Sequence, residues 1–248
     1  MIIIKSSAEL EIMRRAGRLV ARVLQAVAAA AKPGATTAEL DQMAEQTCRA
    51  EGALPAFKGY RGYPYSLCCS LNHEVVHGFP RKEPLREGDI LSVDFGVLLD
   101  GFYGDSARTV TVGEVSPEAQ ALVDATRRSL EAGIEQCRAG NRLGDVSHAI
   151  QLVVEGAGFS VVRQFVGHGI GRGLHEEPQV PNWGEAGRGV KLKPGMVLAI
   201  EPMVNAGGYE VKVLKDGWTA VTVDGKLSAH FEHTVAVGED GPRILSLT

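Results

Sequence analysis

Two acidic residues of this sequence flank a strong turn signal. Asp94 and Asp105 lie on either side of Asp100-Gly101, a pair typical of a two-residue type I′ hairpin turn. If this pair forms the turn, Gly96 faces Asp105, and Asp94 lies two residues further along on the same face. The two carboxylates are then diagonal neighbours about 7–8 Å apart at the backbone, close enough to bind one ion.

Three further residues could complete a metal site. Glu201 ends the apolar segment AIE before Pro202, which favours an extended backbone, Glu232 begins a strand-like run in HFEHTVAV, and His168 lies in GHGIGRGLHEEP. Four carboxylates buried together repel one another and become protonated unless cations join them. Two divalent ions suit such an oxygen-rich set with one imidazole. Singly, an Asp on a strand is more often solvated or capping, and a lone His is more often structural.

An internal repeat supports grouping these acids. Residues 85–97 read LREGDILSVDFGV and residues 192–204 read LKPGMVLAIEPMV, which aligns Asp94 with Glu201 at an offset of 107 residues. Each copy has a Leu, a cation, a Gly, an apolar run and then an acid. A site between the two copies would receive one acid from each.

The segments upstream of these strands repeat as well. Glycines that bound the preceding helical segment align at an offset of 106 residues, namely Gly34 with Gly140 and Gly52 with Gly158. We infer one domain over residues 1–248 with a duplicated helix–helix–strand unit, about 34–113 and about 140–238, packed about a pseudo-twofold axis. The alternative is that the segments leading into the two strands are similar without any duplication of the chain.

The predicted elements indicate an α+β fold, because helix pairs precede groups of strands twice. Helices are expected after the Ser6/Glu9 capping box as far as Lys32-Pro33-Gly34, over Thr37–Ala50, from Ser116-Pro117 to about Arg138, and over Asp145–Ala157. Strands are expected over 90–113 and beyond Phe159, and loops with short strands over 52–84.

Composition excludes several classes of protein. The chain has 248 residues, 44% hydrophobic and 23% charged, which is typical of a folded protein. A formal charge of −4 and a pI near 6.0 argue against nucleic acid as a partner. The apolar runs are too short for a signal peptide or a membrane span, so we expect a soluble, cytoplasmic protein. Four cysteines without a CxxC pair are expected to be reduced thiols.

Some motifs favour ordinary roles. The glycines of GHGIGRG resemble a phosphate loop, but no amphipathic helix follows, and we expect them instead to let a strand approach a substrate closely. We assign no site role to His73, His148 and His230 and expect them to be surface or structural residues. From the residues alone, Tyr60, Tyr63 and Tyr65 are better explained as loop anchors than as site residues.

Five stretches of the chain resemble the type I methionine aminopeptidases, and the resemblance covers nearly the whole length. They are GYRGYPYSLCCSLNHEVVHGFP, VDFGVLLDGFYGDSART, VGHGIGRGLHEEPQV, AIEPM and SAHFEHTVAV. The resemblance implies a pita-bread fold, with two pseudo-twofold-related halves forming an antiparallel sheet covered by helices in a single catalytic domain.

The resemblance also implies roles for individual residues. One metal ion would be held by Asp94, Asp105 and Glu232, and the second by Asp105, His168, Glu201 and Glu232. Glu201 would be the general base, His175 would contact the carbonyl oxygen, and His77 the scissile amide nitrogen or the penultimate residue. The methionine pocket would be lined by Tyr60, Tyr63, Cys68, Leu174 and Trp218. Leu174 replaces a frequent Phe, and Phe57 stands where some members have Cys.

The implied activity is removal of the initiator methionine from nascent proteins whose second residue is small, using two ions of Co, Mn, Fe(II) or Zn. The implied partners are the N-termini of nascent polypeptides, and the protein is expected to be a monomer. Association with the ribosome is possible under this reading. Neither nucleic acid as a substrate nor a membrane is expected as a partner. A proline-specific peptidase of the same fold is one alternative, although such enzymes carry an additional N-terminal domain and this chain reaches the shared unit within its first few residues. A non-enzymatic relative is another, although none of the ligands is missing here.

Overall fold

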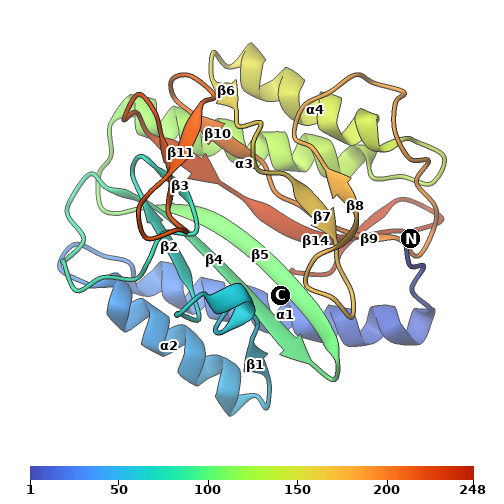
Figure 1. Ribbon diagram of the computed structural model, residues 1–248, viewed down its shortest axis with the longest axis horizontal. Coiled ribbons are helices and arrows are strands. Elements are labelled where there is room, and N and C mark those ends of the chain that lie inside the picture. Colours follow the sequence, from blue (N-terminus) through green and yellow to red (C-terminus); the bar gives the residue numbers. More distant parts are fainter.

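The largest element of the computed structural model, which describes residues 1–248, is a sheet of nine strands in which every pairing is antiparallel (Figure 1). Its strands are β1 (Leu54–Pro55), β2 (Cys68–Leu71), β4 (Ile90–Leu99), β5 (Phe102–Thr111), β7 (Gly167–Gly169), β8 (Glu176–Val180), β9 (Val197–Ile200), β14 (Glu232–Val237) and β15 (Pro242–Ile244).

Two small three-stranded sheets flank the large one. The first contains β6 (Ser160–Val161), β10 (Met203–Asn205) and β13 (Ser228–His230), and the second β3 (Glu74–Val76), β11 (Val211–Val213) and β12 (Ala220–Thr222). The second sheet pairs β3 with β12, which brings residues near 76 and near 220 side by side.

The strand order of the large sheet is symmetric about its centre. In the first half β2 pairs with β4 and β4 with β5, while in the second half β7 pairs with β9 and β9 with β14. The halves join where β5 pairs with β14. The expected pseudo-twofold arrangement of an α+β fold is therefore present.

Four helices cover the sheet: α1 (Ser7–Ala30), α2 (Thr37–Ala50), α3 (Pro117–Gln136) and α4 (Leu143–Gly156). The capping box predicted for α1 is formed, because the Ser6 side chain accepts from the Glu9 N–H and the Glu9 carboxylate accepts from the Ser6 N–H. Helix α4 begins two residues before the expected Asp145. Asp145 is its third residue, and its carboxylate accepts from the Arg142 N–H, so the acid lies inside the first turn. None of the four helices has both the length and the apolar character that a bilayer span requires.

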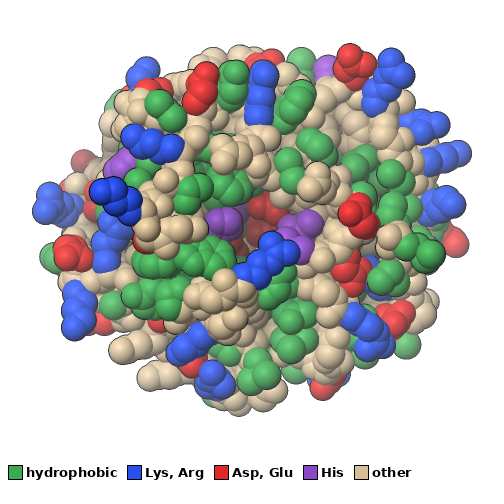
Figure 2. All heavy atoms as spheres, in the orientation of Figure 1, with side chains coloured by type: hydrophobic (Ala, Val, Ile, Leu, Met, Phe, Trp, Pro, Cys, Tyr) green, Lys and Arg blue, Asp and Glu red, His purple; other side chains and the backbone are tan.

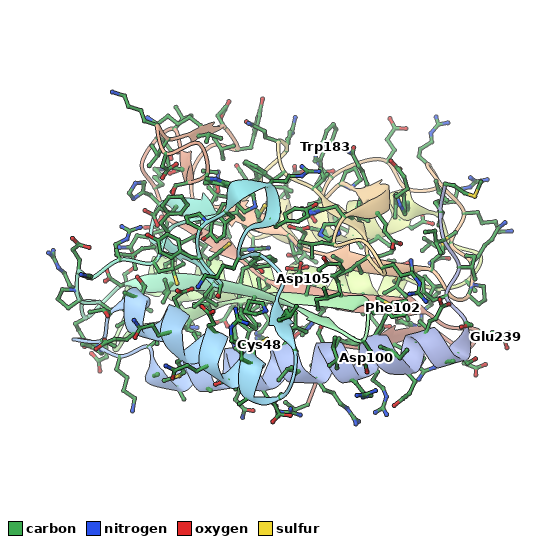
Figure 3. The ribbon with its side chains drawn as sticks, turned by 60° about the horizontal axis from the view of Figure 1, so that its bottom comes forward. Cys48, Asp100, Phe102, Asp105, Trp183 and Glu239 are labelled. Carbon is green, nitrogen blue, oxygen red and sulfur yellow. The ribbon has the colours of Figure 1, made fainter.

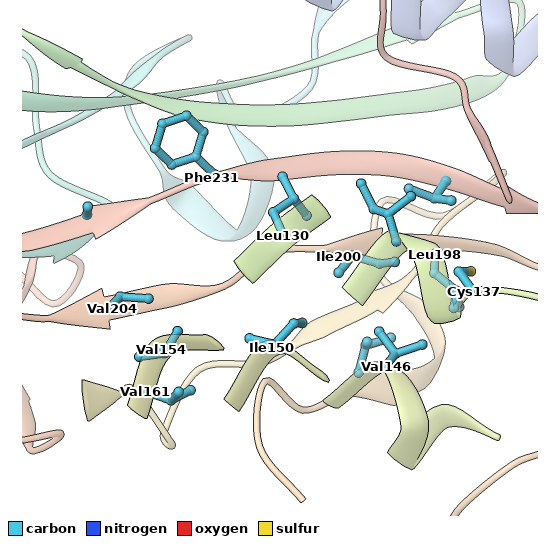
Figure 4. Close-up of a cluster of buried hydrophobic side chains, with 14 of the residues drawn as sticks. Leu130, Cys137, Val146, Ile150, Val154, Val161, Leu198, Ile200, Val204 and Phe231 are labelled. Carbon is cyan, nitrogen blue, oxygen red and sulfur yellow. The ribbon is translucent and has the colours of Figure 1, made fainter. Parts of the chain in front are cut away.

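Each half has its own hydrophobic core. Nineteen buried residues join α1 and α2 to β2 and β4, and twenty-two join α3 and α4 to β9 and β14. Figure 4 shows the second cluster, with Leu130, Ile150 and Leu198 among its members. All four cysteines are free, as predicted, and all four are buried.

Close contact between α1 and β5 determines which way the β5 side chains point. A Cβ on Gly104 would lie 2.8 Å from Gly17 N in α1, so only glycine fits there. Because side chains alternate along a strand, Asp105 points to the opposite face, away from α1. Figure 3 shows Asp105 above the layer of α1 and α2, in the interior between the halves.

Candidate active site

The β4–β5 hairpin places its two acids as the turn signal predicts. Asp100 and Gly101 both have positive φ, 49° and 78°, as a type I′ turn requires. Gly96 pairs with Asp105 and Asp94 with Ala107, so both carboxylates project from one face of the hairpin.

The second half of the chain adds its residues to the same face. Ala107 also pairs with Glu232, which puts Asp94, Ala107 and Glu232 in one row across three strands. In the neighbouring row, the Asp105 N–H donates to Thr234 Oγ1 (3.1 Å), and the Thr234 hydroxyl donates to the Asp105 carbonyl (2.7 Å). This row continues through Ala199, which pairs with both Thr234 and His168.

These rows bring the five expected metal ligands together. One ligand atom each from Asp105, His168 and Glu232 lies within 4.8 Å of the others, and His168 Nε2 lies 3.4 Å from Glu201 Oε1. Buried oxygens of Asp94 (Oδ1), Asp105 (Oδ1) and Glu232 (Oε1) have no hydrogen-bond partner. Because buried polar atoms are nearly always satisfied, three orphaned carboxylate oxygens on one face fit divalent cations.

The electrostatics of the metal-free site agree with this chemistry. Burial raises the pKa of Asp105 to about 7, and raises that of Asp94, Glu201 and Glu232 well above the usual carboxyl range, with the charges of the neighbouring acids adding to the effect. Like charges at this density cannot all ionise without compensation. Bound cations would supply that compensation.

His168 has the tautomer that a metal ligand needs. Its Nδ1 lies 2.9 Å from the Gly169 carbonyl, which can only accept, so Nδ1 carries the hydrogen. Burial and the neighbouring His175 lower the pKa of His168 to about 3, so the ring is neutral. Nε2 therefore offers a lone pair toward the carboxylates, with the carbonyl orienting the ring.

His175 lies on one wall of the site. Its ring centroid is 4.3 Å from that of His168, and its Nδ1 is 2.8 Å from the Tyr60 hydroxyl, with the two rings stacked at 5.3 Å. Burial, and then the charge of Arg61, lower the pKa of His175. Tyr60 thus contacts an expected site residue, beyond any role as a loop anchor.

His77 lies in an aromatic cluster with Trp218 and Tyr63. The β3–β12 pairing brings His77 and Trp218 together, with ring centroids 6.0 Å apart, and Trp218 packs edge-on against Tyr63 at 5.1 Å. His77 has a left-handed backbone, φ 60°, which is uncommon for a residue other than glycine and recurs at functional sites. Burial, and then His175, lower its pKa to about 4, so it is neutral.

The remaining expected pocket residues are buried around this space. Cys68 lies opposite Asp94 in the β2–β4 pair, and Leu174 is buried in a small apolar cluster with Phe57 packed on it. Burial raises the pKa of the Cys68 thiol, so the thiol stays neutral and offers a polarisable sulfur surface to the pocket. Figure 2 shows the resulting hollow, with acidic side chains on its floor and histidines on both sides.

One site residue was missed by the sequence analysis. His73 and His148 are exposed, as expected, but His230 is 2% exposed, and its Nε2 is 3.8 Å from Glu201 Oε2 without a hydrogen-bond partner. Burial, and then His77, lower its pKa to about 3. Its position two residues before Glu232 was the available signal, because alternate residues of an extended segment share a face.

The glycines of GHGIGRG have a different role from the expected one. A Cβ on Gly167 or Gly169 would overlap the carbonyl of Ala199 or of Glu177, and a Cβ on Gly171 would lie 2.7 Å from Glu176 Oε1. The space at each is filled by the protein's own atoms. These three glycines admit neighbouring chain segments, whereas we expected them to admit a substrate.

The architecture and the carboxylate–histidine cluster are those of a metallopeptidase. The profile of metallopeptidase family M24 matches residues 11–239, and the chain belongs to that family. Within it, the chain is 55% identical over 247 residues to a methionine aminopeptidase of Clostridium perfringens, covering 100% of this chain and 99% of that protein. The crystal structure of methionine aminopeptidase from Thermotoga maritima is 50% identical and superimposes with a TM-score of 0.99, covering 100% of both chains.

A more distant similarity concerns the fold alone. The prolidase from Pyrococcus horikoshii superimposes with a TM-score of 0.81 at 21% identity, over 100% of this chain and 64% of that one. The comparisons therefore favour the methionine aminopeptidases over the proline-specific alternative.

Proposed function

We propose that this protein is a metalloaminopeptidase that hydrolyses the peptide bond after an N-terminal methionine when the second residue is small. The observation that carries the proposal is the set of Asp94, Asp105, His168, Glu201 and Glu232 on one face, with orphaned oxygens and two further histidines beside it. Full-length similarity to methionine aminopeptidases supports the choice of substrate.

Two divalent ions fit this set of ligands. Asp94, Asp105 and Glu232 would hold one ion, and Asp105, His168, Glu201 and Glu232 the other, with Asp105 and Glu232 shared. When bound, such ions polarise the scissile carbonyl and lower the pKa of the attacking water. Oxygen-rich sites with one imidazole accept Co(II), Mn(II), Fe(II) and Zn(II), so the ion used must be measured.

The chain's own groups would move the protons and orient the substrate. Glu201 takes a proton from the attacking water and passes it to the leaving amide nitrogen. In the tautomer that this role requires, the Tyr60 hydroxyl donates to His175 Nδ1 and the His175 hydrogen is on Nε2, where it can donate to the carbonyl oxygen as charge develops there. His77 would contact the scissile amide nitrogen or the second residue of the substrate.

The walls suit an unbranched thioether. Tyr63, Cys68, Leu174 and Trp218 supply apolar, aromatic and sulfur surfaces, and Tyr60 adds an aromatic face beside His175. A polarisable methionine side chain packs well against such groups. We further propose action as a cytoplasmic monomer on nascent polypeptides, with ribosome binding to be tested by co-sedimentation and mass by light scattering.

The direct test is reconstitution of metal-free protein, under anaerobic conditions, with Co(II), Mn(II), Fe(II) or Zn(II) and a Met-Gly-type peptide. We expect release of free methionine with at least one ion, and saturation at two ions per chain in a metal titration. A Met-Leu-type peptide and a Gly-Pro dipeptide serve as controls. Cleavage of Gly-Pro without methionine release would favour the proline-specific alternative, and bound metal without any cleavage a non-enzymatic role.

A further inference from the structure

A buried ion pair joins the N-terminal segment to the wall that carries His175. Lys5 Nζ lies 2.6 Å from Glu176 Oε2, and the two side chains are 3% and 9% exposed. Lys5 also donates to the Ile3 carbonyl at 3.2 Å. Replacing a buried pair of this kind by apolar groups is often neutral for stability, so stability alone does not explain it.

Glu176 directly follows His175 and organises the turn before it. Its Oε1 accepts from the Gly173 N–H at 3.0 Å, while Oε2 is bound by Lys5. The Gly171 carbonyl accepts from the Tyr103 N–H at 2.8 Å, and the Gly171 N–H donates to the Gly173 carbonyl at 3.1 Å. One carboxylate therefore connects the chain on both sides of His175 to residue 5.

Two glycines near this ion pair are in close contact with the N-terminal segment. A Cβ on Gly171 would overlap the Lys5 side chain, and a Cβ on Gly195 would lie 2.7 Å from Ile4 Cγ2. The Lys5 N–H donates to the Gly195 carbonyl at 2.8 Å, which fixes the lysine backbone against the segment leading into β9. The lysine is thus held at both its backbone and its ammonium.

We propose that Lys5 is a positioning residue for His175: through Glu176, the N-terminal segment fixes the imidazole against the cleft. The proposal rests on the proposed function, in which His175 donates to the scissile carbonyl. An ammonium whose own backbone is also hydrogen-bonded holds the turn more rigidly than apolar packing, because its hydrogen bonds have defined directions.

The test uses Lys5→Met, Glu176→Gln and the double variant, with Lys193→Met as the matched control at an exposed lysine of the neighbouring segment. In the presence of metal, we expect Lys5→Met to lower kcat about 10- to 100-fold with KM changed less than about threefold. Amide hydrogen exchange over residues 171–176, measured in metal-free protein, should accelerate in Lys5→Met and remain at the wild-type rate in Lys193→Met.

The double variant separates positioning from a merely structural role. It leaves no unpaired buried charge, so its thermal midpoint should recover toward wild type, whereas its kcat should stay low because the tether is absent. Recovery of kcat together with stability would overturn the proposal, as would wild-type kcat and exchange in Lys5→Met. If Lys5→Met does not fold, the double variant and Glu176→Gln carry the test. An inactive wild-type protein would refute the proposed function. The exchange rates would still show whether Lys5 orders residues 171–176.

Discussion

Gly96 lies directly opposite Asp105 in the β4–β5 pair, and the absence of its side chain makes the space that the carboxylate occupies. A Cβ on Gly96 would lie 3.2 Å from Asp105 Oδ1 and 2.9 Å from both Ala56 Cβ and Phe57 Cε1. The oxygen that would be displaced is one of the three orphaned oxygens of the site.

Gly96→Ala should therefore weaken metal binding about 10- to 100-fold, because it shifts Asp105, which we propose as a ligand of both ions. It should also lower the free energy of unfolding by about 1–3 kcal/mol through overpacking. Calorimetric metal titration and urea unfolding measure the two effects. Gly156→Ala, where a Cβ meets nothing within 4 Å, is the control and should leave metal affinity unchanged. Wild-type affinity in Gly96→Ala would contradict this account of Asp105.

Glu201→Gln should lower kcat by about 10²–10⁴-fold, because an amide cannot accept the proton of the attacking water. Its fold should survive, since the substitution preserves shape and removes one member of a mutually repelling group. His168→Ala should abolish turnover by removing the imidazole that we assign to the second ion. Circular dichroism and steady-state kinetics check both variants, and near-wild-type turnover in either would refute its assigned role.

Metal binding should strengthen as pH rises from about 5.5 to 7.5. The pKa of Asp105 is raised to about 7, and the pKa values of the other three acids are raised in the same direction, so an incoming cation must displace protons in this range. His168, with a pKa near 3, does not limit binding there. We expect a change of about tenfold in affinity per pH unit for each proton displaced.

The stabilisation of the fold by bound metal should also increase as pH rises. A raised carboxyl pKa stabilises the metal-free fold below the ordinary carboxyl pKa, and this contribution is lost as pH rises through about 7. The gain in thermal midpoint on adding Mn(II) should therefore be larger at pH 7.5 than at pH 5.5. Titration calorimetry in buffers of different ionisation enthalpy counts the protons released, and a pH-independent affinity would contradict the prediction.

Turnover should be retained in His230→Gln and reduced in His230→Leu. Its Nε2 faces Glu201 Oε2 without a partner in the protein, so an amide can replace its polar contact and an isobutyl group cannot. His230→Leu should leave the free energy of unfolding within about 1 kcal/mol of wild type, because no hydrogen bond of the side chain is broken, while lowering kcat several-fold. Equal kcat in the two variants would show that His230 only fills space.

Much of the local structure follows from short-range signals in the sequence. The capping box at Ser6 and Glu9 and the Asp100-Gly101 turn involve residues within a few positions of one another, so their hydrogen bonds and backbone angles are properties of the local chain. Once the turn was identified, the register of ten residue pairs followed from counting, including the facing pair Gly96 and Asp105. The duplication added the prediction that Asp94 and Glu201 meet.

The sequence by itself therefore determined the α+β type of fold and the choice of candidate ligand residues, because both follow from residue types and their spacing. Only the tertiary structure decided how these groups are poised: burial raises the carboxyl pKa values, His230 meets Glu201, and Lys5 reaches Glu176 across 171 positions of the chain. Burial and long-range contact depend on how distant segments pack. Spacing carried a signal only for His230, two residues before Glu232, whereas the contact of Lys5 with Glu176 arises only when the two halves close around a common cleft.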